Sequence, residues 1–221
     1  RSGSATNGKT YRTLRYNSRG YSQQSPTSNP TRFDLLADDL EYLLDRVNVT
    51  QAHAVLGVSM GGVTAINFAL RHPAKLTKFI ACDCNVAAGE ANNKAWADRV
   101  ALAKNEGMPA LAKITVERWF TPANHSSPNF AKTLAMCEAA SLDGFEQNAG
   151  ALSNYDLKGQ LGGIKVPGLL LAGEADGKLP EVMEGFGRDI PGAEFKSIPQ
   201  AGHLPMLENL EGFMEVLGGF L

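Results

Sequence analysis

The sequence predicts an α/β fold, with a mostly parallel β-sheet flanked by helices and one helical insertion. Short apolar runs alternate with helical patterns, a glycine-flanked serine lies between a strand-like and a helix-like run, and a mainly helical stretch interrupts the alternation. At 221 residues, of which 43% are hydrophobic, the chain is long enough to bury a full core. We expect a core of residues 1–84 and 156–221, interrupted by a helical cap at residues 85–155.

The first half of the chain alternates strand and helix patterns. Residues 11–16 predict a strand, and the leucines that follow recur at helical spacing after a helix start near residues 31–34. Apolar runs at 52–56 and 78–84 predict two further strands, with a helix over 62–70 between them.

The second half begins with the helical insertion. Apolar residues at helical spacing predict four helices there, over residues 92–105, 109–119, 129–140 and 142–153. A Gly-Gly pair then breaks the pattern, and the core resumes. The elements expected after that break are strands at 168–172 and 193–198 and a final helix at 210–221.

A Gly-x-Ser-x-Gly pattern, with Ser59 between Gly57 and Gly61, joins the strand-like run at 52–56 to the helix-like run at 62–70. This is the context of a nucleophile elbow, a sharp turn that exposes a serine hydroxyl. The two glycines let the flanking backbones approach without a clash, and the helix N-terminus favours the negative charge that develops when the serine attacks a carbonyl. Ser59 is therefore the candidate nucleophile.

Two further candidates follow in the order that such an elbow requires. Asp176 comes just past the predicted strand at 168–172, where open α/β sheets place functional groups. His203 lies in the loop after the predicted strand at 193–198. The order Ser59, Asp176, His203 differs from the orders found in the two unrelated serine protease folds.

Several segments together resemble the α/β-hydrolase superfamily. They are residues 15–22, 57–62, 118–122, 166–167 with 173–176, and 201–203. Within that superfamily the chain is most similar to the 3-oxoadipate enol-lactonases, for which Arg-Trp-Phe-Thr-Pro at 118–122 is the narrower pointer. The resemblance implies an α/β-hydrolase fold with an inserted cap, favours Asp176 over the nearby Glu174 as the acid, and implies a small acidic enol-lactone from aromatic-ring breakdown as the substrate.

The resemblance also predicts that the fold is N-terminally truncated. In complete members two or three strands precede the position of Tyr11, and a loop after one of them supplies a donor of the oxyanion hole. Here the backbone N–H of Met60 is assigned as one donor, and the second is not assigned. We expect a second chain or a missing N-terminal segment to complete the sheet beside residues 11–16, since an open sheet edge is a liability. A shortened relative with changed function is the alternative.

Residues of the insertion are candidate substrate contacts. Trp119 and Phe120 supply large packing surfaces, and the resemblance puts them near the pocket mouth. Arg118 is able to bind a substrate carboxylate, although a lone arginine on a helix is usually solvated or paired at the surface. Three other histidines lack a carboxylate at motif spacing and are expected to be structural or solvated: His53, His72 and His125.

Composition narrows the class of protein. A net charge of -2 gives no basic bias toward nucleic acid, and no run approaches the roughly 18 apolar residues of a membrane span. We expect a soluble, cytoplasmic protein of unspecified oligomeric state.

Cys82, Cys84 and Cys137 are expected to be free thiols, with Cys82 and Cys84 on one face of their strand. No zinc spacing is present, and neither a metal nor a cofactor is expected.

The sequence thus predicts a serine hydrolase that cleaves a small ester or lactone. His203, oriented by Asp176, would take the proton of Ser59 as the hydroxyl attacks the carbonyl. The alternative is a non-hydrolytic, ligand-binding or degenerate member of the same fold that lacks a complete oxyanion hole, because fold alone does not determine function.

Overall fold

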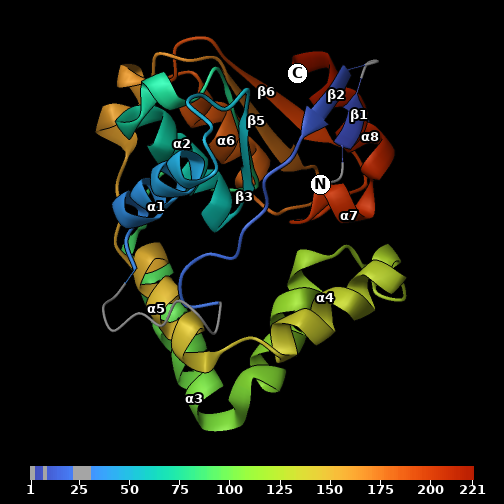
Figure 1. The fold of residues 1–221 in the computed structure, drawn as a ribbon. Coiled ribbons are helices and arrows are strands. Elements are labelled where there is room, and N and C mark those ends of the chain that lie inside the picture. The colour runs from blue at the N-terminus through green and yellow to red at the C-terminus, as the bar shows by residue number, and fades with distance from the viewer. Residues whose placement is uncertain (1–2, 7–8, 22–30) are drawn as a thin grey trace.

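The computed structural model describes residues 3–6, 9–21 and 31–221, and Figure 1 shows a sheet wrapped by helices with a separate group of helices beside it. The main sheet has four parallel strands in the order β3-β4-β5-β6. Their bounds are β3 Val55–Val58, β4 Phe79–Cys82, β5 Gly168–Gly173 and β6 Ala193–Ile198. The strands predicted at 168–172 and 193–198 are confirmed, whereas β3 begins three residues after the predicted start at 52.

Helices cover both faces of this sheet. On one side, α1 packs against α2, the crossover helix between β3 and β4, and α6 packs on β5 and β6; on the other side α8 packs on β6. The bounds are α1 Phe33–Arg46, α2 Met60–Arg71, α6 Leu179–Gly187, α7 Pro205–Glu208 and α8 Leu210–Phe220. Short 3₁₀ helices lie at η1 Pro73–Lys75, η2 Pro122–Asn124 and η3 Lys158–Gly163. The fold class predicted from the sequence is confirmed.

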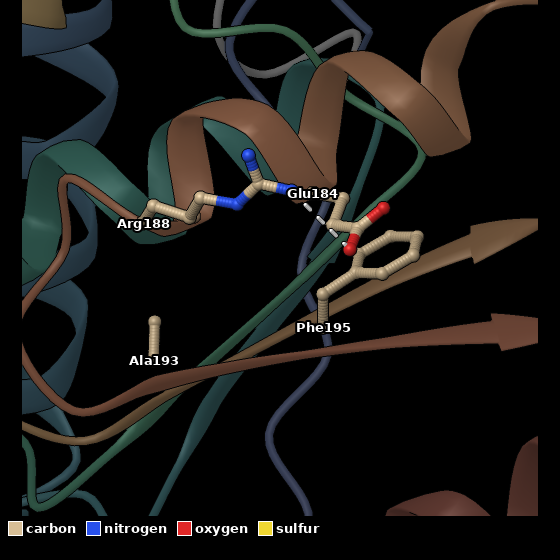
Figure 2. A pocket seen from close by; sticks show the side chains of 5 residues that line it. Glu184, Arg188, Ala193 and Phe195 are labelled. Carbon is tan, nitrogen blue, oxygen red and sulfur yellow. Dashed lines mark ion pairs between the residues drawn. The ribbon is translucent and has the colours of Figure 1, made fainter.

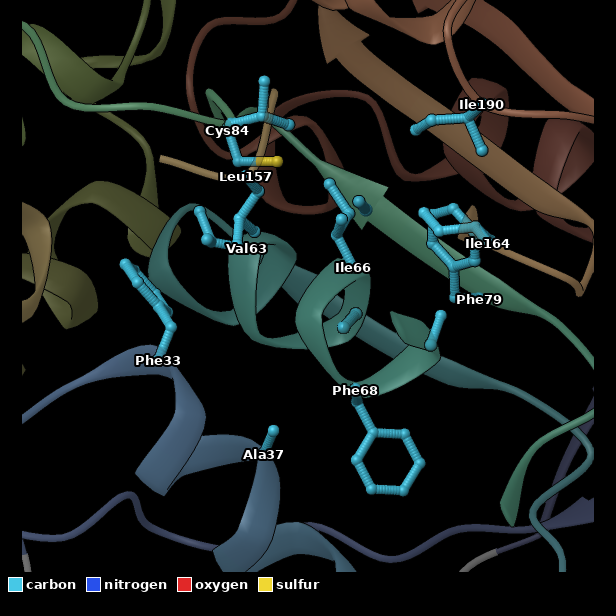
Figure 3. Close-up of a cluster of buried hydrophobic side chains, with 14 of the residues drawn as sticks. Phe33, Ala37, Val63, Ile66, Phe68, Phe79, Cys84, Leu157, Ile164 and Ile190 are labelled. Carbon is cyan, nitrogen blue, oxygen red and sulfur yellow. The ribbon is translucent and has the colours of Figure 1, made fainter. Parts of the chain in front are cut away.

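Alternation along the central strands divides the core in two. Phe79 and Ala81 of β4 pack into the larger cluster with α1, α2 and α6, while Ile80 and Cys82 face the smaller cluster with α8. Figure 3 shows part of the larger cluster gathered around α2. Because β4 and β5 are buried on both faces, they are continuous apolar runs, as expected of central parallel strands.

The prediction that Cys82 and Cys84 share a face is wrong. Cys82 belongs to the smaller cluster and Cys84 to the larger one. The strand ends at Cys82, and Asp83 has a positive φ of 45°, which breaks the two-residue alternation that the prediction assumed. Both thiols, and that of Cys137, are free in the structure, as predicted.

The insertion folds as predicted into helices that pack on one another. Its elements are α3 Glu90–Trp119, α4 Pro128–Glu138 and α5 Leu142–Ser153, with α4 and α5 both contacting α3. Gly107 interrupts α3 with φ 87° and ψ 167°, and Pro109 follows, so that α3 consists of two helices joined at a kink. These are the helices predicted at 92–105 and 109–119. Figure 1 shows the three helices grouped at one end of the molecule, apart from the sheet.

The strand predicted at residues 11–16 is wrong in extent and in position. A strand β2 covers Lys9–Arg12 and pairs antiparallel with β1 Gly3–Thr6, forming a hairpin that does not join the main sheet. Residues 13–16 lie in none of the strands of the described residues, and Leu14 and Tyr16 are 44% and 39% exposed. The hairpin lies instead against the C-terminal end, where the side chains of Lys9 and Tyr11 donate hydrogen bonds to the carbonyl oxygen of Leu221.

The strand β3 is an edge of the main sheet, with β4 as its neighbour and no strand of the described residues on its other side. Its Leu56 side chain is 46% exposed. The second chain or N-terminal segment expected beside this sheet therefore stays a prediction.

Among the helices of the described residues, none is both long and apolar enough to cross a membrane.

Candidate active site

Ser59 occupies a strained turn between β3 and α2. It follows the last residue of β3, precedes Met60, which opens α2, and has φ 54° and ψ -118°. A positive φ at a non-glycine residue is costly, and such strain is typical of a nucleophile elbow. A Cβ atom on Gly57 would lie 2.0 Å from the carbonyl oxygen of Gly61, so only glycine fits there.

The elbow is tied to the end of the neighbouring strand. The backbone N–H of Ser59 donates a hydrogen bond of 2.8 Å to the carbonyl oxygen of Cys82, the last residue of β4. Ser59 therefore lies beside the carboxyl end of β4. As the first residue of α2, Met60 has a backbone N–H without an intrahelical acceptor, which leaves it available to a ligand.

The structure brings Asp176 and His203 into direct contact. Asp176 lies in the turn after β5, where its N–H donates to the carbonyl oxygen of Gly173 over 3.0 Å. Its Oδ2 lies 2.7 Å from Nδ1 of His203. Because a carboxylate oxygen only accepts, Nδ1 carries the proton and donates it, which leaves Nε2 of a neutral imidazole as an acceptor. His203 is 9% exposed, so this hydrogen bond is shielded from bulk water.

The cap reaches His203 through Trp119. The carbonyl oxygen of Trp119 accepts the N–H of His203 over 2.8 Å, and the two rings stack with their centroids 5.7 Å apart and 24° between their planes. Phe120 is 3% exposed and packs edge-on against Phe130 of α4. Trp119 is thus placed at the candidate site, while Phe120 supports the cap from within; their contact with substrate stays a prediction.

Glu208 is a part of the site that the sequence reasoning missed. Its Oε2 accepts the N–H of Gly202 over 2.6 Å, and its Oε1 accepts the N–H and the hydroxyl of Thr121, each over 2.7 Å, and the side-chain amide of Asn124 over 3.0 Å. One carboxylate therefore fastens the loop that carries His203 to the end of the cap helix. No local pattern signals this contact, because Thr121 is 87 residues away in the sequence.

Asp83 is the second residue that the sequence reasoning missed. It follows β4 as Asp176 follows β5, and the same rule about strand ends could have found it. Burial raises the pKa of its carboxyl group to about 9; the N–H of Gly173 lowers that pKa, and the charge of Asp176 raises it further. A group with that pKa carries its proton at neutral pH.

Candidate ligand atoms of three of these side chains lie close enough to hold a cation. The atoms of Asp83, Asp176 and His203 are within 4.8 Å of one another. Their hydrogen bonding fits a metal poorly, however, because Nδ1 of His203 already donates to Asp176 and Asp83 keeps its proton at neutral pH. The arrangement is therefore suited to proton transfer.

The other histidines lie outside this group. His53 stacks on Tyr11, His72 contacts the carboxylates of Asp38 and Glu41, and His125 contacts the carbonyl oxygens of Glu117 and Phe120. These contacts fit the structural roles that the sequence predicted for them.

A surface hollow of about 250 Å³ lies between α6 and β6 (Figure 2). It is lined by Glu184, Gly187, Arg188, Ala193 and Phe195. Ala193 begins β6, whereas the loop that carries His203 follows the other end of that strand. The hollow is therefore separate from the candidate active site.

The family of the chain follows from a comparison of its sequence with known families. The family model described as the alpha/beta hydrolase fold matches residues 3–210. The chain belongs to the α/β-hydrolase family. The prediction made from the motifs is thereby confirmed.

Individual relatives include lactonases and esterases. The chain is 33% identical to 3-oxoadipate enol-lactonase 2 of Acinetobacter baylyi over 75% of its own length, and it spans 62% of the length of that relative. Its structure resembles the enol-lactonase from Burkholderia xenovorans LB400, with a TM-score of 0.89, 28% identity and coverage of 96% of this chain and 82% of that one. The structure also resembles a thermophilic esterase from Thermogutta terrifontis, with a TM-score of 0.84 and 26% identity; the match covers 92% of this chain and 77% of the esterase. Enzymes of both kinds cleave carboxylic esters.

Proposed function

We propose that this chain carries the catalytic residues of a serine hydrolase that opens a small lactone or ester with an acidic group, most similar in activity to a 3-oxoadipate enol-lactonase. The observation that carries the proposal is the 2.7 Å contact between Asp176 and His203 at the edge of the sheet where the strained Ser59 turn lies. The likeness to an enol-lactonase of known structure supports the choice of a lactone.

The proposed mechanism is acyl transfer to water. Ser59 Oγ attacks the lactone carbonyl carbon, and Nε2 of His203 takes its proton; Asp176 stabilises the imidazolium that forms. The ring C–O bond then breaks, and His203 returns the proton to the departing enol oxygen, which stays attached to the acyl group. A water molecule, deprotonated by Nε2 of His203, then attacks the acyl carbon; the bond from that carbon to Oγ of Ser59 breaks, and His203 returns the proton to Oγ as the open-chain acid leaves. The N–H of Met60 donates to the oxyanion in both stages.

Two arginines of the cap support an acidic substrate. Burial, and secondarily the charge of Arg118, lowers the pKa of Arg99. Arg118 is exposed as a residue; partial desolvation of its guanidinium lowers its pKa, and the charge of Asp176 opposes that change. The two guanidinium groups are thus close enough to repel each other, and Arg118 is close enough to the candidate site to sense its carboxylate. Within the described ranges neither arginine has an ion-pair partner, and Arg99 lies over the ring of Trp96 at 4.7 Å. A substrate carboxylate would relieve this repulsion.

The experiment compares hydrolysis of two lactones of equal ring size, one with a carboxylate side group and one with its methyl ester. We expect a higher kcat/KM for the acid, and Arg118→Gln should raise KM for the acid while leaving the ester nearly unchanged. Arg71→Gln is the matched control, because Arg71 is paired with Asp38 and is the last residue of α2, at the end opposite to Ser59. Equal kcat/KM for both lactones would overturn the acidic substrate class, and unchanged turnover by Ser59→Ala would overturn the serine mechanism.

A further inference from the structure

Asp83 is held rigidly at the end of β4. Its N–H donates to the carbonyl oxygen of Leu171 over 2.8 Å, and its Oδ1 accepts the N–H of Gly173 over 2.8 Å. The residue is 1% exposed and has a positive φ of 45°. A buried residue in a strained conformation that faces a reactive group is a candidate for a functional role.

One oxygen of this buried carboxyl group lacks a hydrogen bond. Oδ2 of Asp83 has no partner among the described residues, although candidate ligand atoms of Asp83, Asp176 and His203 lie within 4.8 Å of one another. An ionised carboxylate in this place would be desolvated, unpaired on one oxygen and adjacent to a second carboxylate, which is costly. A protonated carboxyl group, in contrast, has a hydroxyl hydrogen to donate.

The charged groups around Asp83 favour the protonated form. Burial raises the pKa of Asp83 most, the N–H of Gly173 lowers it, and the negative charges of Asp176 and Glu208 raise it further. The neighbouring thiols of Cys82 and Cys84 have pKa values raised mainly by burial, so both thiols stay neutral and place no additional negative charge beside Asp83.

We propose that Asp83 is a positioning residue, whose protonated carboxyl group donates a hydrogen bond from Oδ2 to the carboxylate of Asp176 and thereby fixes the carboxylate that orients His203. The proposal rests on the proposed function, since it assigns Asp83 a role toward the candidate acid. No proton is transferred in this step: the hydrogen stays on Asp83, and the negative charge stays on Asp176. Loss of that hydrogen at high pH would replace the hydrogen bond by repulsion between two anions.

The test is a pair of substitutions. Asp83→Asn keeps an acceptor for the N–H of Gly173 and a donor toward Asp176, so it mimics the protonated acid. Asp83→Ala removes both. We expect kcat of Asp83→Asn to stay near that of the wild type, and kcat of Asp83→Ala to fall by about 10- to 100-fold through misplacement of His203. A large loss in Asp83→Asn equal to that in Asp83→Ala would overturn the proposal, because it would mean that Asp83 acts as an anion.

The pH profile adds a measurement that a merely structural role would not change. The wild type should lose kcat as the pH rises through about 9, and Asp83→Asn should lack that loss. Asp38→Asn, which removes a carboxylate that contacts His72 instead, should keep the wild-type profile. Identical alkaline limbs in the wild type and Asp83→Asn would overturn the proposal.

A readout without turnover separates this proposal from the proposed function. The Nδ1 proton of His203 should give a far-downfield NMR resonance in Ser59→Ala, and this resonance should persist when Asp83→Asn is added. It should weaken or shift upfield when Asp83→Ala is added. If no substrate is hydrolysed, the resonance still tests the hydrogen-bond chain, and a resonance unmoved by Asp83→Ala would refute it.

Discussion

Glu208→Ala is expected to destabilise the fold and slow hydrolysis together, because Glu208 joins the loop of His203 to the end of the cap. The substitution leaves the backbone N–H groups of Gly202 and Thr121 without their acceptor, at distances that were 2.6 and 2.7 Å. His203 also depends on this junction, since its own N–H donates to Trp119, two residues before Thr121.

The magnitude follows from the two backbone hydrogen bonds. A hydrogen bond to a charged group contributes about 1.5–3 kcal/mol, so two such bonds contribute about 3–6 kcal/mol when buried and about half of that here, because Glu208 is only partly buried. The expected loss is about 1.5–3 kcal/mol in the free energy of unfolding, which lowers Tm by about 3–12 °C for a chain of this length. The side-chain donors of Thr121 and Asn124 contribute less, because water can replace the carboxylate there.

The assay is thermal unfolding by circular dichroism, with ester hydrolysis measured well below Tm. Glu208→Gln should be intermediate, because its amide group accepts through one oxygen and loses one of the two backbone bonds. Glu184→Ala is the matched control: its ion pair with Arg188 is exposed and contributes about 0.5 kcal/mol or less. Wild-type Tm and kcat in Glu208→Ala would refute the assigned junction.

Three further predictions follow from the site. Asp83→Asn should become more stable relative to the wild type as the pH rises. The pKa of Asp83 is raised from 3.8 to about 9 in the folded state, so the stabilisation by its bound proton is complete below about pH 4 and is lost by about pH 9. In urea unfolding, the wild type should lose about 1.4 kcal/mol of its free energy of unfolding per pH unit across that range. A pH-independent difference would contradict it. Gly57→Ala should distort the elbow and lower the free energy of unfolding in urea by about 3 kcal/mol or more, because the new Cβ would clash with the backbone of Gly61. A Cβ on Gly61 meets nothing within 4 Å, so Gly61→Ala should keep wild-type stability. Equal losses in the two variants would contradict the close contact between the backbones of Gly57 and Gly61. Ser59→Ala with His203→Ala should be little slower in ester hydrolysis than either single variant, and multiplying losses would show that the two residues do not act as a unit.

The sequence predicted the elements whose apolar pattern decides their structure. The helices of the cap have apolar residues at helical spacing, β5 is a short continuous apolar run, and β6 alternates between its two faces. Gly107 with Pro109 marks the kink between two predicted helices. The stretch at 11–16 has apolar residues too, but a strand needs a partner and an apolar layer, and neither is readable from six residues.

The candidate site was predictable where a motif stands next to an element boundary. Ser59, Asp176 and His203 each follow a strand, and Asp83 carries the same signal without a motif. Its positive φ, which separates Cys82 from Cys84, is a tertiary property of a turn and has no sequence signature in an aspartate. Glu208 could not be found in this way, since its partners come from distant segments.

Covalent labelling by a serine-directed fluorophosphonate, followed by intact mass and peptide mapping, tests most directly whether Ser59 is an activated nucleophile. We expect a single adduct on Ser59 in the folded wild type, none in Ser59→Ala and much slower labelling in His203→Ala, because the base that removes the serine proton is then absent. An adduct that persists in Ser59→Ala, or no adduct in a well-folded wild type, would contradict the serine hydrolase mechanism; the second result would favour a non-hydrolytic, ligand-binding member of the fold.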